Sequence, residues 1–233
     1  MTAGAERPVV LATGFGPFPG APENPTRDLV ESLRSGWGER RGELHTAVLP
    51  TRYHAAREMV LRLHRRLRPD IAVHFGFSFR ATGFMLERTA ENRVMPGRLD
   101  AAGARPARGR IHEAGPLACP SALPLDPIHG ALRERGLPVA YSGNAGGYVC
   151  NLVFYAAAAR RRPTLTGFVH IPLASEMRAR PSQRARAGRH LVTLSRANLI
   201  DGARVILDTC VAEWQVASRR HKKEPPRGGG PVI

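Results

Sequence analysis

The chain has 233 residues, of which 42% are hydrophobic and 23% are charged, so it can bury one sizeable core and is not disordered along its whole length. It has no run of about 18 apolar residues, the length that a membrane-spanning helix needs, and its first residues lack the pattern of a secretion signal. We therefore expect one domain in the cytoplasm and no membrane partner.

The formal charge of +16 raises the question of nucleic-acid binding, because clustered cations bind phosphate groups. Lysine occurs only at positions 222 and 223, and no aromatic residues are interleaved with the arginines to stack on bases. The arginines are concentrated in two places: Arg62, Arg65, Arg66 and Arg68, and Arg178, Arg180, Arg184, Arg186 and Arg189. We interpret both groups as solvated surface, and we do not expect a nucleic-acid partner.

The first third of the chain alternates short apolar runs with a helical pattern. Residues 8–12 are typical of a buried strand that enters the glycine-containing loop 13–16. A helix is expected from about Thr26, because Thr26 and Asp28 suit a helix start. Residues 53–67 carry apolar side chains at helical spacing, and residues 71–75 form the next buried strand.

The same alternation continues to the end of the chain. The expected elements are helices over 125–135, 148–160 and 194–216, and strands over 138–141 and 167–171. Strands that alternate with helices indicate a mostly parallel sheet. We therefore predict an α/β fold, a single-domain three-layer sandwich with helices on both faces of the sheet.

The predicted domain spans residues 1–217, and its functional side chains are expected at the carboxyl ends of the strands. Residues 97–117 are rich in Gly, Ala and Arg and are expected to form a long loop or hairpin beside that edge. Residues 218–233 form a basic tail that cannot build a core, so we expect it to be disordered.

The three cysteines differ in their sequence context. They show no CxxC spacing, which argues against a disulfide framework or a structural zinc site. Cys210 fits a buried apolar position, as free cysteines usually do. Cys150 instead falls in the first turn of a predicted helix, directly after Gly146 and Gly147. There the positive end of the helix favours a thiolate, and the glycines let backbone N–H groups approach a substrate carbonyl.

A cysteine nucleophile needs a base and a group that orients the base. His170 ends the next predicted strand, and Glu87 lies beyond the strand that stops at Gly76, so both can reach the same sheet edge. Each residue also has a simpler interpretation. Cys150 can be a core thiol, His170 a structural histidine and Glu87 a surface partner of Arg88. No metal-binding spacing such as HExxH occurs, so no metal site is predicted.

Four separated segments resemble pyroglutamyl peptidase I, also called pyrrolidone-carboxylate peptidase, a family of cytosolic cysteine peptidases. Residues 13–20 (TGFGPFPG), with Asn24 and Pro25 after them, are similar to the family's TGFxPFxG...NP loop. Residues 87–92 (ERTAEN) match ERxAxN, and residues 142–151 (SGNAGGYVCN) are similar to the nucleophile segment SNxAGxxxCN. Residues 167–172 (GFVHIP) match GFxHxP, and the order of the four segments is kept.

The resemblance implies Cys150 as the nucleophile, His170 as general base and then acid, and Glu87 as the carboxylate that orients the imidazole. It implies a peptide substrate with an N-terminal pyroglutamyl residue and no cofactor or metal. The sequence leaves the oligomeric state open, with a homodimer or homotetramer among the options. The substrate-binding residues that the resemblance implies are Phe15 and Phe18, which sandwich the lactam ring, and Asn24, Tyr148 and Val149.

The chain departs from the family pattern after Gly76. Residues 77–81 (FSFRA) replace a stretch that is usually rich in Gly or Ala and ends in Arg, and Arg98 is only an approximate counterpart of a second family arginine. The rings of Phe77 and Phe79 can either narrow the pocket or turn into the core. Two alternatives therefore stay open: a cysteine amidase of the same fold that acts on another small cyclic or N-acyl group, and a non-catalytic binding protein.

Overall fold

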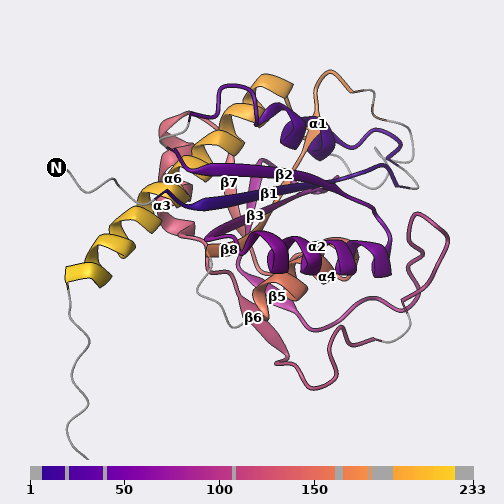
Figure 1. The fold of residues 1–233 in the computed structure, drawn as a ribbon. Helices are drawn as coiled ribbons and strands as arrows, with labels where there is room; N and C mark the ends of the chain where they lie inside the picture. The colour runs from indigo at the N-terminus through magenta and orange to yellow at the C-terminus, as the bar shows by residue number, and fades with distance from the viewer. Residues whose placement is uncertain are drawn as a thin grey trace, which may run out of the picture.

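A six-stranded sheet forms the centre of the computed structural model, which describes residues 7–18, 21–38, 41–106, 109–160, 165–177, 179 and 191–223. The strand order is β2-β1-β3-β8-β4-β7 (Figure 1). In chain order the strands are β1 (Val9–Phe15), β2 (Glu43–Leu49), β3 (Ile71–Phe77), β4 (Phe84–Glu87), β7 (Val139–Ser142) and β8 (Leu165–Ile171). All neighbouring pairs are parallel except β4 and β8.

Two small sheets lie beside the main one. Strand β5 (Thr89–Glu91) pairs antiparallel with β6 (Ala118–Pro120). Strand β9 (Leu173–Ala174) pairs parallel with β10 (Thr193–Leu194). The β5–β6 pair follows Glu87 directly and packs against the helix that begins with the nucleophile segment, which ties that helix to the end of β4.

Helices cover both faces of the sheet, as predicted (Figure 1). Helices α1 (Pro25–Ser32), α3 (Leu125–Glu134) and α6 (Arg196–Lys223) pack on one face, and α2 (Tyr53–Leu67) and α4 (Val149–Ala158) pack on the other. The α/β three-layer prediction is confirmed. None of the described helices is long and apolar enough to cross a membrane.

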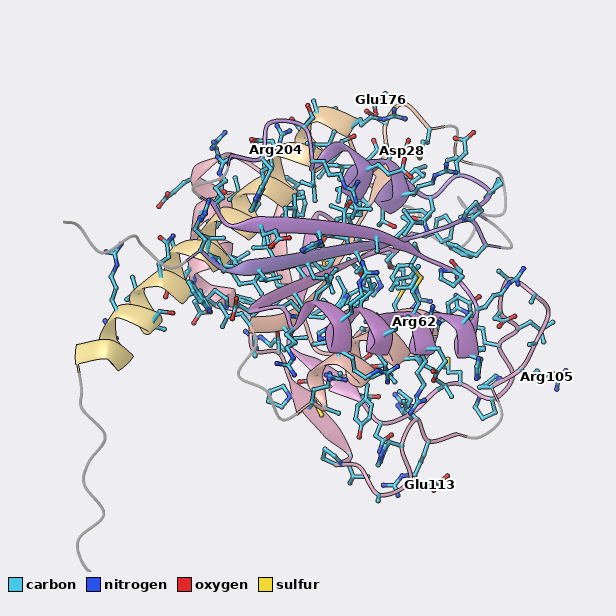
Figure 2. All side chains as sticks on the ribbon, in the orientation of Figure 1. Asp28, Arg62, Arg105, Glu113, Glu176 and Arg204 are labelled. Atoms are coloured by element: carbon cyan, nitrogen blue, oxygen red, sulfur yellow. The ribbon has the colours of Figure 1, made fainter. Side chains whose placement is uncertain are left out.

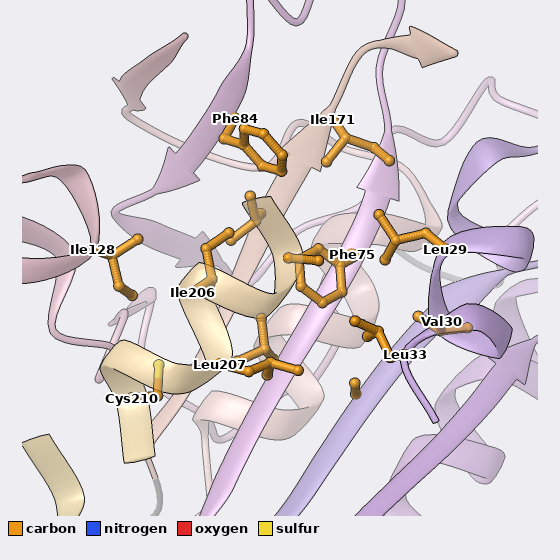
Figure 3. Close-up of a cluster of buried hydrophobic side chains, with 14 of the residues drawn as sticks. Leu29, Val30, Leu33, Phe75, Phe84, Ile128, Ile171, Ile206, Leu207 and Cys210 are labelled. Atoms are coloured by element: carbon orange, nitrogen blue, oxygen red, sulfur yellow. The ribbon is translucent and has the colours of Figure 1, made fainter. Parts of the chain in front are cut away.

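The larger core fills the layer between the sheet and helices α1, α3 and α6. Figure 3 shows Leu29 and Leu33 of α1 and Ile206 and Leu207 of α6 around Phe75 of β3, all of them buried. Every residue of β3 is buried, which is typical of a central strand with helices on both sides. Cys210 lies in the same core, as its sequence context predicted.

Several element boundaries differ from the prediction. Helix α1 is capped by Asn24, whose side chain accepts a hydrogen bond from the Thr26 amide, so the cap lies two residues before the predicted start. Helix α6 continues to Lys223, beyond the predicted helix end at 216, so residues 218–223, which were expected to be disordered, are helical. Residues 224–233 of the predicted tail lie outside the described residues.

The surface predictions are met where the structure describes them. Residues 97–117 form loops and turns in their described part, 97–106 and 109–117. Arg62, with the other arginines of its group, is exposed on α2, in agreement with a solvated helix face (Figure 2). The second arginine group, between residues 178 and 189, lies outside the described residues.

Candidate active site

Strand β4 brings Glu87 to His170. Because β4 runs antiparallel to β8, the register pairs Met85 with His170 and Glu87 with Phe168, so the Glu87 and His170 side chains lie on the same face of the sheet. The His170 Nδ1–H donates to Glu87 Oε1 over 2.7 Å, and both side chains are buried. Oε2 of Glu87 has no hydrogen-bond partner among the described residues. Within the described part of the chain, the Glu87 carboxylate forms a hydrogen bond with the imidazole and with no other group.

Cys150 lines the same cavity as His170, and its hydrogen bonding and charge act on the imidazole. Because Nδ1 is bonded to Glu87, the nitrogen left for the thiol is Nε2. Burial by itself lowers the pKa of His170, but the hydrogen bonds and charges of Cys150 and Glu87 outweigh it and raise the pKa to about 10. Both neighbours thus favour the protonated form of the ring, which can donate a proton.

Helix α4 begins at the residue before Cys150, and its first amides are free of intrahelical bonds. Tyr148 is the N-cap without a side-chain capping bond, and the first helical hydrogen bond runs from the Leu152 amide to the Tyr148 carbonyl. The amides of residues 149–151 thus present N–H groups and the positive end of the helix beside the thiol. Such donors can stabilise an oxyanion formed on a carbonyl that Cys150 attacks.

Asn151 fixes this helix start to the segment after Glu87. Its Nδ2 donates to the carbonyls of Glu91 and Arg93, at 2.8 Å each, and its Oδ1 accepts from the Glu91 amide at 2.9 Å. The residue is fully buried. No role is predicted for Asn151 from the sequence, although its place directly after Cys150 in the motif is a signal that it contributes to the site.

Gly76 makes room for the His170 ring on the neighbouring strand. The register of β3 and β8 places Gly76 beside His170. A Cβ atom at position 76 would lie 2.6 Å from the Phe168 ring and 3.0 Å from His170 Cδ2, which is too close for a side chain. The glycine therefore leaves room beside β3 for the Phe168 and His170 rings.

Cys150, His170 and Glu87 line a cavity of about 870 Å³. Phe18 is half-buried on its wall, with its ring centroid 6.4 Å from that of Tyr148 and 6.5 Å from that of Phe77. Phe15 also lines the cavity, but it is only 2% exposed. The structure thus brings together the three candidate catalytic residues and the two predicted aromatic residues.

The other three predicted substrate-binding residues differ in how they face the cavity. Tyr148 and Asn24 line it. The Asn24 amide also holds its own loop, since Nδ2 donates to the Gly16 carbonyl and Oδ1 accepts from Thr26. The Val149 side chain is fully buried in the core between α2, α4 and the sheet, and it does not line the cavity. Only the backbone N–H of Val149 is placed to take part.

Phe77 and Phe79, the two bulky residues of the departure from the family pattern, both line the cavity. Their rings meet edge to face with centroids 4.5 Å apart. Phe77 is mostly buried and also packs in a small cluster with Ala21 and Leu173. Both rings thus belong to the wall of the cavity, and Phe77 contributes to the core as well.

A mostly parallel α/β sheet with a thiol at a helix start, a buried imidazole and a carboxylate at one edge defines the class of cysteine hydrolases. The family model of pyroglutamyl peptidase matches residues 8–209. The chain belongs to the pyroglutamyl peptidase family, and it is a cysteine-type peptidase.

Individual relatives agree with this assignment. The chain is 34% identical over 227 residues to a pyrrolidone-carboxylate peptidase of Chromobacterium violaceum, covering 96% of this chain and 98% of the relative. Its structure resembles a mutant pyrrolidone carboxyl peptidase of Pyrococcus furiosus with a TM-score of 0.78 at 28% identity, covering 88% and 99% of the two chains. Pyroglutamyl peptidase I of Bacillus amyloliquefaciens gives a TM-score of 0.77 at 27% identity, with 89% and 98% covered.

Proposed function

We propose that this enzyme removes the N-terminal pyroglutamyl residue from peptides, with Cys150 as nucleophile, His170 as acid and base, and Glu87 as the group that orients His170. The observation that carries the proposal is the continuous chain of contacts from Glu87 through His170 to Cys150 on the wall of one cavity. The names of the relatives supply the substrate: they are pyrrolidone-carboxylate or pyroglutamyl peptidases.

The acylation step uses the thiolate and the imidazolium together. The Cys150 sulfur attacks the carbonyl carbon that joins the pyroglutamyl residue to the next residue, and the carbonyl oxygen takes up the negative charge. Amides at the start of α4 stabilise that oxyanion. The His170 Nε2–H then donates its proton to the leaving nitrogen, the carbon–nitrogen bond breaks, and a thioester of pyroglutamate and Cys150 remains.

The deacylation step reverses these roles. Neutral His170 takes a proton from water, and the oxygen of that water attacks the thioester carbon. The carbon–sulfur bond breaks, which releases pyroglutamate and restores the thiolate beside the imidazolium. Glu87 holds Nδ1 throughout, so that Nε2 stays directed at the sulfur and the leaving group. The proposed steps use only these side chains, the backbone amides and water.

The cavity wall suits an uncharged, flat ring. Phe18 and Tyr148 offer aromatic faces, and a lactam gains from such contacts without needing a charged partner. Replacing Phe18 by Ala should weaken substrate binding by about 1–3 kcal/mol, judged from stacking and apolar burial. The expected result is a higher KM with a smaller change in kcat, measured by steady-state kinetics. An unchanged KM would remove Phe18 from the binding site.

The decisive assay is hydrolysis of pyroglutamyl-aminocoumarin by the wild-type enzyme and by Cys150→Ala. We expect fluorescence release by the wild-type enzyme only. Cys210→Ala is the matched control, because Cys210 is fully buried on the other side of the sheet. Hydrolysis of a different acyl-aminocoumarin, without hydrolysis of the pyroglutamyl compound, would contradict the proposal and favour the amidase alternative.

Alkylation by iodoacetamide separates an enzyme from a binding protein. Cys150 is partly exposed, whereas Cys119 and Cys210 are buried. We expect Cys150 to be alkylated first and activity to be lost in step with its labelling, as mass spectrometry of the peptides would show. Equal labelling of all three cysteines would argue against an activated nucleophile.

We further propose a cytoplasmic location, where reducing conditions keep this thiol free. A homodimer or homotetramer stays a prediction.

A further inference from the structure

The accessible charge on the active-site cavity is positive. Arg80, Arg93 and Arg98 line it, and Arg93 is ion-paired with Glu91. Within the part of the chain that the structure describes, neither Arg80 nor Arg98 is paired with a carboxylate, and both are exposed. The acidic side chain on the described wall, Glu87, is buried and bonded to His170. Neither guanidinium group is therefore ion-paired within the described structure. The buried carboxylate near Arg98, that of Asp100, accepts hydrogen bonds from the Tyr53, Ala102 and Ala104 amides instead.

Arg98 lies in a turn that is fastened to the segment before the nucleophile. The Arg98 amide donates to the Met95 carbonyl at 3.2 Å, and the Met95 amide donates to the Gly147 carbonyl at 2.8 Å. The Tyr53 hydroxyl donates to the Arg98 carbonyl at 2.9 Å. The guanidinium carbon lies 4.3 Å from the centre of the Tyr148 ring, two residues before Cys150. The charge is thus held over the ring of Tyr148, in the segment that leads to the nucleophile.

Close contact between two loops sets this arrangement. A Cβ atom at position 147 would lie 2.5 Å from Met95 Cγ, so Gly147 lets the turn of Met95 and Arg98 approach the start of α4. The Tyr148 hydroxyl donates to the Leu99 carbonyl at 3.2 Å and fixes the turn from its other end. The backbone of Arg98 is therefore held in place by hydrogen bonds, even though its side chain is exposed.

The lactam ring of the proposed substrate gives these guanidinium groups no partner, because it is uncharged. The remaining part of the substrate is the leaving peptide, whose first residue lies on the amine side of the scissile bond. We propose that Arg98, with Arg80, selects substrates that carry a carboxylate on this first leaving residue. The carboxylate is either an acidic side chain or the free C terminus of a pyroglutamyl dipeptide. This inference rests on the proposed function and names the substrate class of the same site.

The expected preference is moderate, because both arginines are exposed to solvent. Exposed ion pairs change binding by a small factor, so we expect kcat/KM to be roughly 1.5- to fivefold higher for a carboxylate than for a neutral group of the same shape. The preference should shrink as salt rises from about 10 mM to 1 M, since the Debye length falls from about 30 Å to 3 Å. A preference caused by shape would not respond to salt.

The test compares matched peptides by chromatography of released pyroglutamate. Pyroglutamyl-glutamate amide against pyroglutamyl-glutamine amide isolates the side-chain carboxylate. Pyroglutamyl-alanine against its amide isolates the C-terminal carboxylate. We expect the charged member of at least one pair to be cleaved faster, and pyroglutamyl-lysine amide to be cleaved more slowly than the glutamine peptide. Equal kcat/KM within both pairs would overturn the inference.

Variants assign the effect to the arginines. Arg98→Gln and Arg80→Gln should each reduce the carboxylate preference, and Arg98→Lys should retain most of it. Arg133→Gln is the control, because it removes the same charge from an exposed site on α3, which covers the opposite face of the sheet. An undiminished preference in both Gln variants would contradict the inference.

The neutral substrate pyroglutamyl-aminocoumarin separates the two proposals. If the wild-type enzyme cleaves it but shows no carboxylate preference among the peptides, the proposed function stands and the inference on Arg98 and Arg80 fails. If the wild-type enzyme cleaves neither this compound nor any of the peptides, both are contradicted.

Discussion

Two buried histidine sites on the same side of the sheet have opposite electrostatic character. His74 on β3 and His170 on β8 lie on neighbouring strands, and both rings face the layer of α2 and α4. His170 Nδ1–H donates to Glu87. His74 Nδ1 is hydrogen-bonded to the Thr13 hydroxyl at 2.7 Å, and its ring packs 5.8 Å from that of His64 on α2. The Nε2 atoms of His64 and His74 have no partner among the described residues.

The two sites differ in the charge of their partners rather than in burial. Burial lowers the pKa of His74 well below its usual range, and the neighbouring His64 adds to the effect. Burial and the Arg160 charge lower the pKa of His64 to about 4. At His170 the Cys150 and Glu87 side chains overcome burial and raise the pKa. A buried imidazole therefore becomes a usable acid at neutral pH only where an anionic partner accompanies it.

Replacing His170 and replacing His64 should give the largest difference in kcat between the two sites. We expect His170→Ala to lower kcat on pyroglutamyl-aminocoumarin by about 10²- to 10⁴-fold, the usual contribution of general acid–base catalysis. His64→Phe should leave kcat close to that of the wild-type enzyme, because His64 does not line the cavity. Comparable losses in the two variants would show that His170 acts through folding, which circular dichroism would check.

Glu87→Gln removes the negative charge beside His170 but keeps the shape of the side chain. We expect kcat to fall by on the order of 10²-fold or more, with less change in KM, because the amide no longer stabilises the imidazolium. A pure KM effect would assign Glu87 to substrate binding.

The same variant should also move the alkaline limit of activity. The pKa of His170 is raised to about 10, so its imidazolium persists well above neutral pH. Without the carboxylate the pKa falls, and the proton donor is lost at a lower pH. The kcat/KM profile of Glu87→Gln should therefore decline earlier on the alkaline side. A profile with the wild-type alkaline limit would mean that Glu87 does not control this titration.

Thr13→Val tests how much the hydrogen bond to the buried His74 contributes to stability. The change leaves Nδ1 of the buried His74 without its hydroxyl partner, and we expect a loss of about 1–3 kcal/mol in the free energy of unfolding. Urea unfolding at pH 7 measures this loss. An unchanged urea midpoint would mean that the hydroxyl contributes no net stability.

Acid should destabilise the protein through His64 and His74. Because their folded-state pKa values are lowered, the unfolded chain binds more protons, and stability falls as the pH drops below about 6.5. The slope for one such histidine is about 1.4 kcal/mol per pH unit, down to about pH 4 for His64. His64→Phe should flatten this slope between pH 6.5 and 4.5 in urea unfolding. An equally steep slope in the variant would assign acid sensitivity to other groups.

His170 has the opposite linkage to stability. Its pKa is raised in the folded state, so its stabilising contribution is complete below about pH 6.5 and is lost as the pH rises toward 10. Glu87→Gln should therefore weaken the alkaline dependence of unfolding and leave the acid dependence intact. If Glu87→Gln instead changed the acid dependence of unfolding and left the alkaline dependence intact, the contrast between the two histidine sites would be contradicted.

The local spacing of apolar residues was sufficient to predict most of the helices and strands of the main sheet. Residues 53–67 form the predicted helix without a difference at either end, because the apolar spacing and the flanking residues act within one segment. Strand β2 was not predicted, since it is a half-buried edge strand with polar residues such as Glu43 and Thr46. Strand β4, which has four residues, was also missed.

Local signals in the sequence pointed to cysteine peptidase chemistry: a cysteine at a helix start, a histidine at a strand end and a glutamate in a segment that resembles the family. The sequence did not determine that Glu87 and His170, 83 residues apart, would lie 2.7 Å from each other. That contact requires β4 to insert between β8 and β7, antiparallel to β8 and parallel to β7, a register decided by packing of the whole sheet. The pairing of His64 with His74 and the position of Arg98 over Tyr148 depend on tertiary structure for the same reason, since helical or strand periodicity specifies neighbours only within a segment.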